Sequence, residues 1–96
     1  MGRKRNKATM KPGGETWFVY LLGCADGSLY TGITKDVDRR SRQHNDGTAS
    51  RYTRSRRPTV LVYQEAQPSK SAALKREAAI KALARSEKMA LIRLAG

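Results

Sequence analysis

The segment VYLLGCADGSLYTGI, residues 19–33, decides the fold of this 96-residue chain. Two apolar runs flank an Asp-Gly pair, which is typical of a β-hairpin. The pattern predicts a strand at 17–24, apolar throughout and therefore covered on both faces, and a return strand at 28–34. Tyr20 and Tyr30 stand in these runs, and their surroundings decide whether they are core aromatics or parts of a polar site.

The length of the hairpin turn determines which way the two tyrosines point. With a two-residue turn, Tyr20 and Tyr30 lie on opposite faces of the sheet. A three-residue loop at 25–27, with its glycine in the left-handed conformation, pairs Tyr20 with Gly32 and puts both tyrosines on one face. The tripeptide Ala-Asp-Gly suits the three-residue loop. We therefore predict that register, in which Gly32 leaves room for the neighbouring tyrosine ring.

The rest of the chain predicts one more strand and three helices, separated by residues typical of helix ends and turns. The predicted segments are a helix at 36–45 that Asp36 caps, a polar and basic loop at 46–57, a strand at 59–66, a long helix at 69–84, and a short helix at 86–95 that Ser86 caps. The order β-β-α-β-α-α predicts an α+β fold, with a small three-stranded sheet flanked by helices.

The first 15 residues are basic and poor in apolar side chains, so we predict a disordered tail at 1–15 and a single domain at 16–96. No apolar run approaches the roughly 20 residues of a membrane span, and the N-terminal segment lacks the apolar stretch of a signal peptide. The single cysteine, Cys24, belongs to no zinc-binding pattern. These features predict a cytoplasmic protein.

Charge is the strongest signal in the composition. Twenty Lys and Arg residues against eight Asp and Glu residues give a formal net charge of +12. A soluble domain this basic typically has a polyanionic partner, of which nucleic acid is the commonest. The alternative is a solubilising surface with a basic tail. An anionic membrane surface is a weaker rival, because no segment shows a strong aromatic or leucine face.

The predicted helix at 36–45 has a polar inner face. Its best inward face, spaced i, i+3, i+4 and i+7, holds Val37 and three polar residues, among them Arg40 and His44. We therefore predict that Arg40 and His44, one turn apart, point into a polar pocket. A solvated surface charge is the alternative for each of them, and it is the interpretation that we accept for Arg39 and Arg42.

The long predicted helix holds a carboxylate inside its apolar arc. Glu77 falls among the residues that should face the core, where a charge is costly unless a cation or a metal ion meets it. An i,i+4 surface pair of Glu77 with Lys81 is the alternative, and the periodicity favours neither interpretation.

Three segments thus offer polar groups where core residues are expected. Arg40 can clamp a phosphate and Glu77 can bind a single metal ion, while Tyr20, Tyr30 and His44 can transfer protons. Hydrolysis of a phosphodiester needs these three kinds of group: one to neutralise the phosphate, one to activate water and one to stabilise the leaving alkoxide.

In this order and spacing, the motifs resemble the GIY-YIG nuclease superfamily. The likeness rests on Val-Tyr-Leu at 19–21, Tyr-Thr-Gly at 30–32, Arg40 and Glu77, and it covers residues 16–95. The small stand-alone bacterial members (the YhbQ-like group) are the most similar, since DGSLYTGIT, YTRSRRP and REAAIK are typical of them. The resemblance implies a three-stranded antiparallel sheet flanked by helices.

The resemblance also implies site residues and a cofactor. Tyr20 and Tyr30 match the two motif tyrosines, and Arg40 matches the helix arginine that steadies the phosphate. Glu77 matches the glutamate that binds one divalent ion, Mg2+ or Mn2+. His44 stands where some members carry a histidine or tyrosine near the attacking water. In the family scheme a tyrosine, here Tyr30 with help from His44, assists deprotonation of that water.

The basic segment SRYTRSRRP, residues 50–58, is the predicted substrate grip. Its arginines can pair with phosphates and its tyrosine can stack on a base. The nucleic-acid-binding residues predicted here are Arg51, Tyr52, Arg54, Arg56 and Arg57. The alternative is a flexible charged loop.

Two departures from the family pattern limit the functional prediction. The asparagine that several members carry after the glutamate is missing, since Asn6 and Asn45 both precede Glu77, and no DNA-recognition module is attached. We predict a metal-dependent DNA endonuclease, structure-selective or non-specific, in DNA repair or processing. The alternative is a non-catalytic nucleic-acid-binding module with a vestigial site. DNA, or RNA, is the expected partner of a monomer or weak dimer without a small-molecule cofactor.

Overall fold

A computed structural model describes residues 16–95, so the basic tail predicted at 1–15 lies outside the described part of the chain. The described elements follow the predicted order, with one short helix added between the first long helix and the third strand. They are β2 (Trp17–Gly23), β3 (Leu29–Thr34), α1 (Val37–Asp46), α2 (Arg51–Arg54), β4 (Val60–Gln67), α3 (Lys70–Lys81) and α4 (Arg85–Ala95). Within these residues no helix is long and apolar enough to cross a membrane.

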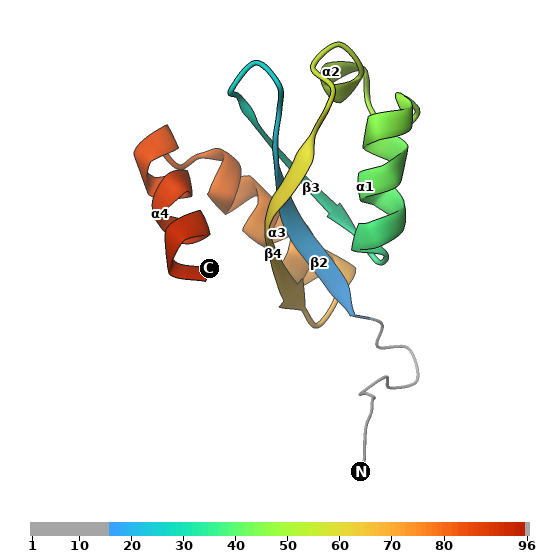
Figure 1. The fold of residues 1–96 in the computed structure, drawn as a ribbon. Coiled ribbons are helices and arrows are strands. Elements are labelled where there is room, and N and C mark those ends of the chain that lie inside the picture. The colour runs from blue at the N-terminus through green and yellow to red at the C-terminus, as the bar shows by residue number, and fades with distance from the viewer. Residues whose placement is uncertain (1–15, 96) are drawn as a thin grey trace.

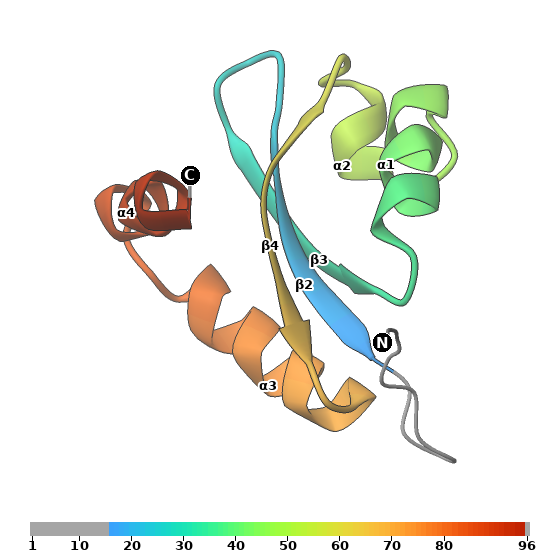
Figure 2. The same cartoon turned by 60° about the horizontal axis from the view of Figure 1, so that its bottom comes forward.

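The three strands form one antiparallel sheet in the order β3-β2-β4. Helices α1 and α2 lie on one side of the sheet, and α3 and α4 lie on the other (Figures 1 and 2). The predicted α+β fold is therefore confirmed. Because β2 is central and covered on both faces, its residues Val19, Tyr20, Leu21 and Leu22 are all buried, with at most 2% exposed.

The hairpin has the predicted three-residue loop. Gly27 adopts the left-handed conformation with φ of 87°, and the N–H of Cys24 donates to the carbonyl of Ser28 at 2.9 Å. In the resulting register Tyr20 lies opposite Gly32. The prediction that both tyrosines share a face is confirmed, and this is the face that α1 and α2 cover.

The opposite face of the sheet carries the apolar core. Val19 and Leu21 of β2 pack with Ala73 and Ile80 of α3, and all four are fully buried. Because side chains alternate along a strand, the same strand gives two residues to this core and Tyr20 to the other face. Burying four such side chains stabilises the position of α3 under β2 and β3.

Helix α1 begins after the predicted cap Asp36 and ends at Asp46, one residue beyond the predicted end. The Asp36 carboxylate accepts the N–H of Arg39 at 3.1 Å, and Gly47 ends the helix in the left-handed conformation with φ of 85°. Val37 and His44 are its buried residues. The predicted inner face is thus correct, and a histidine fills the place of a core residue there.

The prediction of an irregular loop at 46–57 is wrong in one part. The segment contains α2, a single helical turn that begins after Ser50. The Ser50 hydroxyl oxygen accepts the N–H of Thr53 at 3.1 Å, which is the usual N-cap bond. A turn of four residues is too short to show the apolar periodicity that reveals a longer helix.

The prediction that Ser86 caps the last helix is also wrong. Helix α4 starts one residue earlier, at Arg85, so Ser86 lies within it. The carboxylate of Glu87 accepts the N–H of Ala84 at 2.8 Å and takes over the capping role.

Candidate active site

Tyr20 lies across the edge strand β3, in the space that Gly32 leaves open. A Cβ atom built on Gly32 would lie 2.5 Å from the Tyr20 hydroxyl, so any other residue there would displace the ring. Tyr30 lies beside it, with 6.4 Å between the two ring centroids. The hairpin therefore places both tyrosines side by side, with Tyr20 buried and Tyr30 half-buried.

His44 joins these tyrosines from α1. It is 1% exposed, and its Nε2 lies 2.8 Å from the Tyr20 hydroxyl. The Tyr30 ring meets the imidazole edge-on, with 4.9 Å between the ring centroids. On its other side, Nδ1 lies 2.7 Å from Oγ1 of Thr53 in α2. The histidine is thus held at both nitrogens and faces the two tyrosines.

Arg40, one turn before the histidine, is half-buried on the same side of α1. Its Nε donates to Oε1 of Gln43 at 3.1 Å. Its positive charge acts on both neighbours, since it partly opposes the rise in the pKa of Tyr20 and adds to the lowering of the pKa of His44. Arg40 is therefore close to the tyrosine–histidine pair, as a group that clamps a phosphate there must be.

Burial keeps both partners of the central hydrogen bond uncharged at neutral pH. Burial, with the neighbouring Tyr30 and the charge of Glu77 adding to it, raises the pKa of Tyr20 to about 12, although Arg40 acts in the opposite direction. Burial and the Arg40 charge lower the pKa of His44 below its usual value. Tyr20 is thus an O–H donor, and His44 is a neutral base.

The depressed pKa of His44 predicts how stability depends on pH. Unfolded His44 takes up a proton below about pH 6.5, whereas the folded state resists protonation. The contribution of His44 to stability is therefore fully present above pH 6.5. It is lost as the pH falls below 6.5 and through the lower folded pKa, by at most about 1.4 kcal/mol per pH unit. Urea unfolding at several pH values checks this, because His44→Gln should lack that part of the pH dependence while its carboxylates still titrate. Identical profiles would contradict it.

Glu77 lies on α3, the helix that packs against β2 and β3. Its side chain is 18% exposed, and Nζ of Lys81 lies 3.4 Å from Oε2. The i,i+4 pair considered from the sequence therefore exists. The negative charge of Glu77 makes a minor contribution to the raised pKa of Tyr20, after burial and the neighbouring Tyr30. The two interpretations of Glu77 do not exclude each other.

The donor set around Glu77 fits a shared metal ion rather than a closed metal site. Residues 16–95 contain no group of three or more His, Cys, Asp or Glu side chains placed to hold a metal. Mg2+ is commonly bound by one or two carboxylates together with substrate phosphates and water. Glu77 can supply the single carboxylate of such an arrangement, in which the substrate completes the site.

The predicted substrate grip divides into two kinds of residue. Arg51 and Arg54 are exposed on α2 and are free to meet phosphates. Arg57 instead donates from Nε to the carbonyl of Arg54 at 2.9 Å and from Nη1 to that of Asn45 at 3.3 Å. Arg57 is also exposed, and these two bonds join the ends of α1 and α2.

Arg56 is also committed within the fold. Its Nε donates to the Asp26 carboxylate of the hairpin turn at 2.9 Å, and its guanidinium lies 3.8 Å over the Tyr52 ring. Tyr52 is 39% exposed, and its ring centroid lies 5.8 Å from that of Tyr30. The cation covers one face of Tyr52, so a base that stacks there needs the other face or a displaced Arg56.

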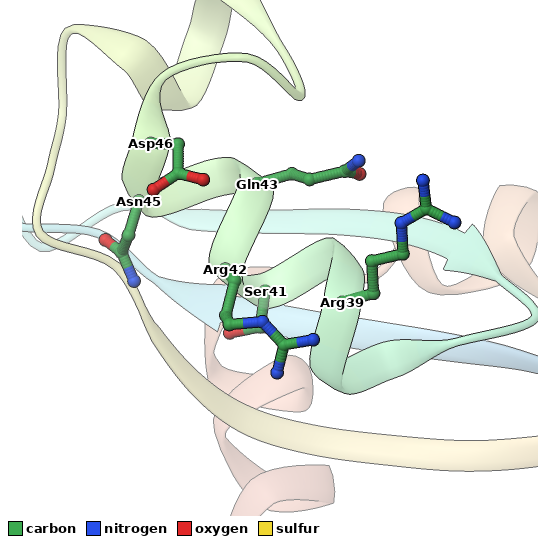
Figure 3. Close-up of a pocket in the computed structure, with 6 residues that line it drawn as sticks. All are labelled: Arg39, Ser41, Arg42, Gln43, Asn45 and Asp46. Carbon is green, nitrogen blue, oxygen red and sulfur yellow. The ribbon is translucent and has the colours of Figure 1, made fainter.

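A depression along α1 is lined by residues of that helix and not by the tyrosines or His44 (Figure 3). Arg39 and Arg42 extend from it, and Asp46 adds an opposite charge. Both arginines are exposed, in agreement with their interpretation as solvated surface charges.

Thr53 is a further residue of this cluster that the sequence did not predict; it is 0% exposed and touches His44. The available signal was the spacing of Ser50 and Thr53, which suits an N-cap three residues before a buried hydroxyl.

The fold and this cluster define a class of protein: a small α+β domain that presents a tyrosine pair, a histidine, an arginine and a carboxylate beside a basic helix. The sequence profile described as the GIY-YIG catalytic domain matches residues 16–90. The chain belongs to the GIY-YIG family.

The chain is also similar to UPF0213 proteins and to two solved structures. A UPF0213 protein of Staphylococcus aureus (strain Mu3) is 52% identical over 79 residues, which are 82% of this chain and 96% of that relative. The solution NMR structure of the UPF0213 protein BH0048 from Bacillus halodurans has 47% identity and a TM-score of 0.54. That of the protein EF2693 from E. faecalis has 37% identity and a TM-score of 0.57. Each alignment covers 82% of this chain and 84% of the other. The family is a nuclease superfamily, and its members act on nucleic acid and generally depend on a divalent metal.

Proposed function

We propose that this chain is a metal-dependent endonuclease that hydrolyses DNA phosphodiester bonds, structure-selectively or without sequence preference, in DNA repair or processing. The observation that carries the proposal is the buried hydrogen bond between the Tyr20 hydroxyl and Nε2 of His44, at 2.8 Å and beside Arg40. A neutral base bonded to a tyrosine and next to a cation is a proton-transfer site for an anionic substrate.

The geometry suggests how the proton leaves the attacking water. We assign the general base to the Tyr20–His44 pair rather than to Tyr30, because it is the Tyr20 hydroxyl that lies 2.8 Å from Nε2, whereas Tyr30 meets the imidazole edge-on. As the water oxygen bonds to phosphorus, its proton passes to the Tyr20 oxygen and the proton of Tyr20 passes to Nε2 of His44. Because burial raises the pKa of Tyr20 to about 12, a free phenolate is costly, and the two transfers occur together. The phosphorus–oxygen bond to the leaving alkoxide breaks, and the alkoxide takes a proton from solvent.

The other residues bind and orient the phosphate. Arg40 neutralises its non-bridging oxygens, and the half-buried Tyr30 lines the open side of the site. Glu77 would hold the divalent ion together with the substrate phosphate, and the bound ion supplies Lewis-acid stabilisation of the developing negative charge. The missing asparagine after Glu77 predicts a slow enzyme rather than a different reaction.

The exposed arginines of α2 are proposed to grip the substrate backbone. Removing Arg54 should weaken DNA binding for all sequences alike and reduce the slope of log K against log salt by about 1. Arg57→Ala is the matched comparison, because Arg57 bonds to two helix-end carbonyls and its loss should lower the melting temperature. Binding titrations at several salt concentrations check the prediction, which an unchanged salt slope in Arg54→Ala would contradict.

A cleavage panel tests the proposed function. Single-stranded, duplex and branched DNA and RNA are incubated with the purified protein and Mg2+ or Mn2+, with EDTA as the metal-free control. We expect nicking of at least one DNA form that EDTA abolishes. Tight, salt-sensitive binding without cleavage of any substrate would overturn the proposal and favour a binding module with a vestigial site.

A further inference from the structure

Thr53 has a buried hydroxyl group that contacts His44 at the ring nitrogen opposite Tyr20. It is 0% exposed and lies on the Nδ1 side of His44, away from the Tyr20 hydroxyl at Nε2, with its Oγ1 2.7 Å from Nδ1. Its backbone N–H is already bonded to the Ser50 side chain. The hydroxyl is therefore not needed to complete the helix cap, and its bond to the histidine calls for a separate explanation.

The hydrogen-bond pattern determines which nitrogen of His44 carries the proton. The buried Tyr20 O–H needs an acceptor, and Nε2 of His44 is the acceptor that the described residues place within hydrogen-bonding distance. Nε2 must therefore be unprotonated. In a neutral imidazole the proton then sits on Nδ1 and is donated to Oγ1 of Thr53. The Thr53 hydroxyl can direct its own hydrogen to Ser50, whose Oγ lies at 3.2 Å and whose carbonyl lies at 3.5 Å.

We propose that Thr53 is a positioning residue that fixes the Nδ1–H tautomer and the ring orientation of His44, so that Nε2 stays free to accept the proton of Tyr20. The inference rests on the proposed function for its catalytic consequence, but the tautomer itself does not depend on that function. Four groups from four elements face the imidazole: Tyr20 of β2, Tyr30 of β3, Arg40 of α1 and Thr53 of α2.

Of these four groups, only Thr53 can hold the proton on Nδ1. Arg40 carries no acceptor, and Tyr30 meets the ring edge-on rather than through a hydrogen bond to Nδ1. Without the threonine hydroxyl, the Nδ1–H is buried and unsatisfied, which disfavours this tautomer. The alternative Nε2–H tautomer turns its N–H toward the Tyr20 oxygen and blocks transfer of the tyrosine proton.

The test compares Thr53→Val, which keeps the shape of the side chain and removes the hydroxyl, with Thr53→Ser, which keeps the hydroxyl. His44 is the single histidine of the chain, so its two ring nitrogens give unambiguous 15N NMR signals at pH 7.5. We expect the Nδ1–H pattern in the wild type and in Thr53→Ser, and a shift toward Nε2–H in Thr53→Val. The Thr53→Val protein should bind DNA normally and cleave it roughly 10- to 100-fold more slowly, the loss typical of removing an outer partner that orients a histidine.

The two proposals fail in different ways. Absence of cleavage by the wild type overturns the proposed function, while the 15N spectra still decide the role of Thr53. An Nε2–H pattern in the wild type, or an unchanged tautomer in Thr53→Val, overturns the positioning role. Thermal melts of all three proteins separate the effect from unfolding, and a Thr53→Ser protein that cleaves as slowly as Thr53→Val would also overturn the proposal.

Discussion

Glu77→Gln is expected to reduce Mg2+-dependent cleavage by on the order of 1,000-fold and to leave metal-free DNA binding intact. Glutamine has the shape of glutamate but lacks the charge that holds a divalent ion, and a lost Lewis acid costs several kcal/mol of transition-state stabilisation. The substitution should be tolerated structurally, because the Lys81 pair that it removes is partly exposed and contributes little to stability.

Single-turnover cleavage rates with titrated Mg2+ measure this effect, with DNA binding in EDTA measured in parallel. Glu87→Gln is the matched control, since Glu87 is a second helical glutamate that is exposed and caps α4 away from the tyrosines. Its cleavage rate should be that of the wild type. If the Glu77→Gln protein cleaves normally at saturating Mg2+, Glu77 is not a metal ligand. Its ion pair with Lys81 would then be the interaction that remains to explain its position.

Local chemistry made much of the fold predictable. The turn residues Ala-Asp-Gly are sufficient to choose the hairpin register, because only a left-handed Gly27 allows the three-residue loop. That register then determines the shared face of Tyr20 and Tyr30. The inner face of α1 was predictable for the same reason, since helical spacing alone brings His44 and Arg40 to one side.

Contacts between distant segments could not be predicted in this way. In the sequence, Arg56 and Arg57 cannot be distinguished from the other arginines of the basic segment. In the structure, Arg56 bonds to the hairpin turn and Arg57 bonds to the ends of two helices. Their roles depend on partners up to 30 residues away. The Thr53–His44 bond depends likewise on how α2 packs against α1, which no periodicity reports.

The position of Glu77 shows a different limit. Periodicity placed it inward, and it could not decide between a metal ligand and a pair with Lys81. The structure shows the pair, and the Glu77 charge adds a minor contribution to the raised pKa of Tyr20. Glu77 can pair with Lys81 and still influence Tyr20, because a charge acts over a longer distance than a direct contact does.

Tyr20→Phe is expected to reduce cleavage roughly 100- to 1,000-fold with little change in DNA binding. Phenylalanine fills the same space over Gly32 but cannot relay a proton, and loss of a positioned acid–base group typically costs this much. The change also leaves Nε2 of His44 buried without a donor, so stability should fall by about 1–3 kcal/mol. That cost is small enough for a folded domain to survive.

Tyr63→Phe is the control that separates chemistry from stability. The Tyr63 hydroxyl also donates to a partly buried partner, the Glu65 carboxylate, on the face of the sheet away from His44. The variant should therefore lose stability while it keeps the wild-type cleavage rate. Because both variants lose a tyrosine hydroxyl bond, equal losses of cleavage would mean that stability limits activity. Full activity in Tyr20→Phe would move the general base to Tyr30, the half-buried tyrosine on the open side of the site.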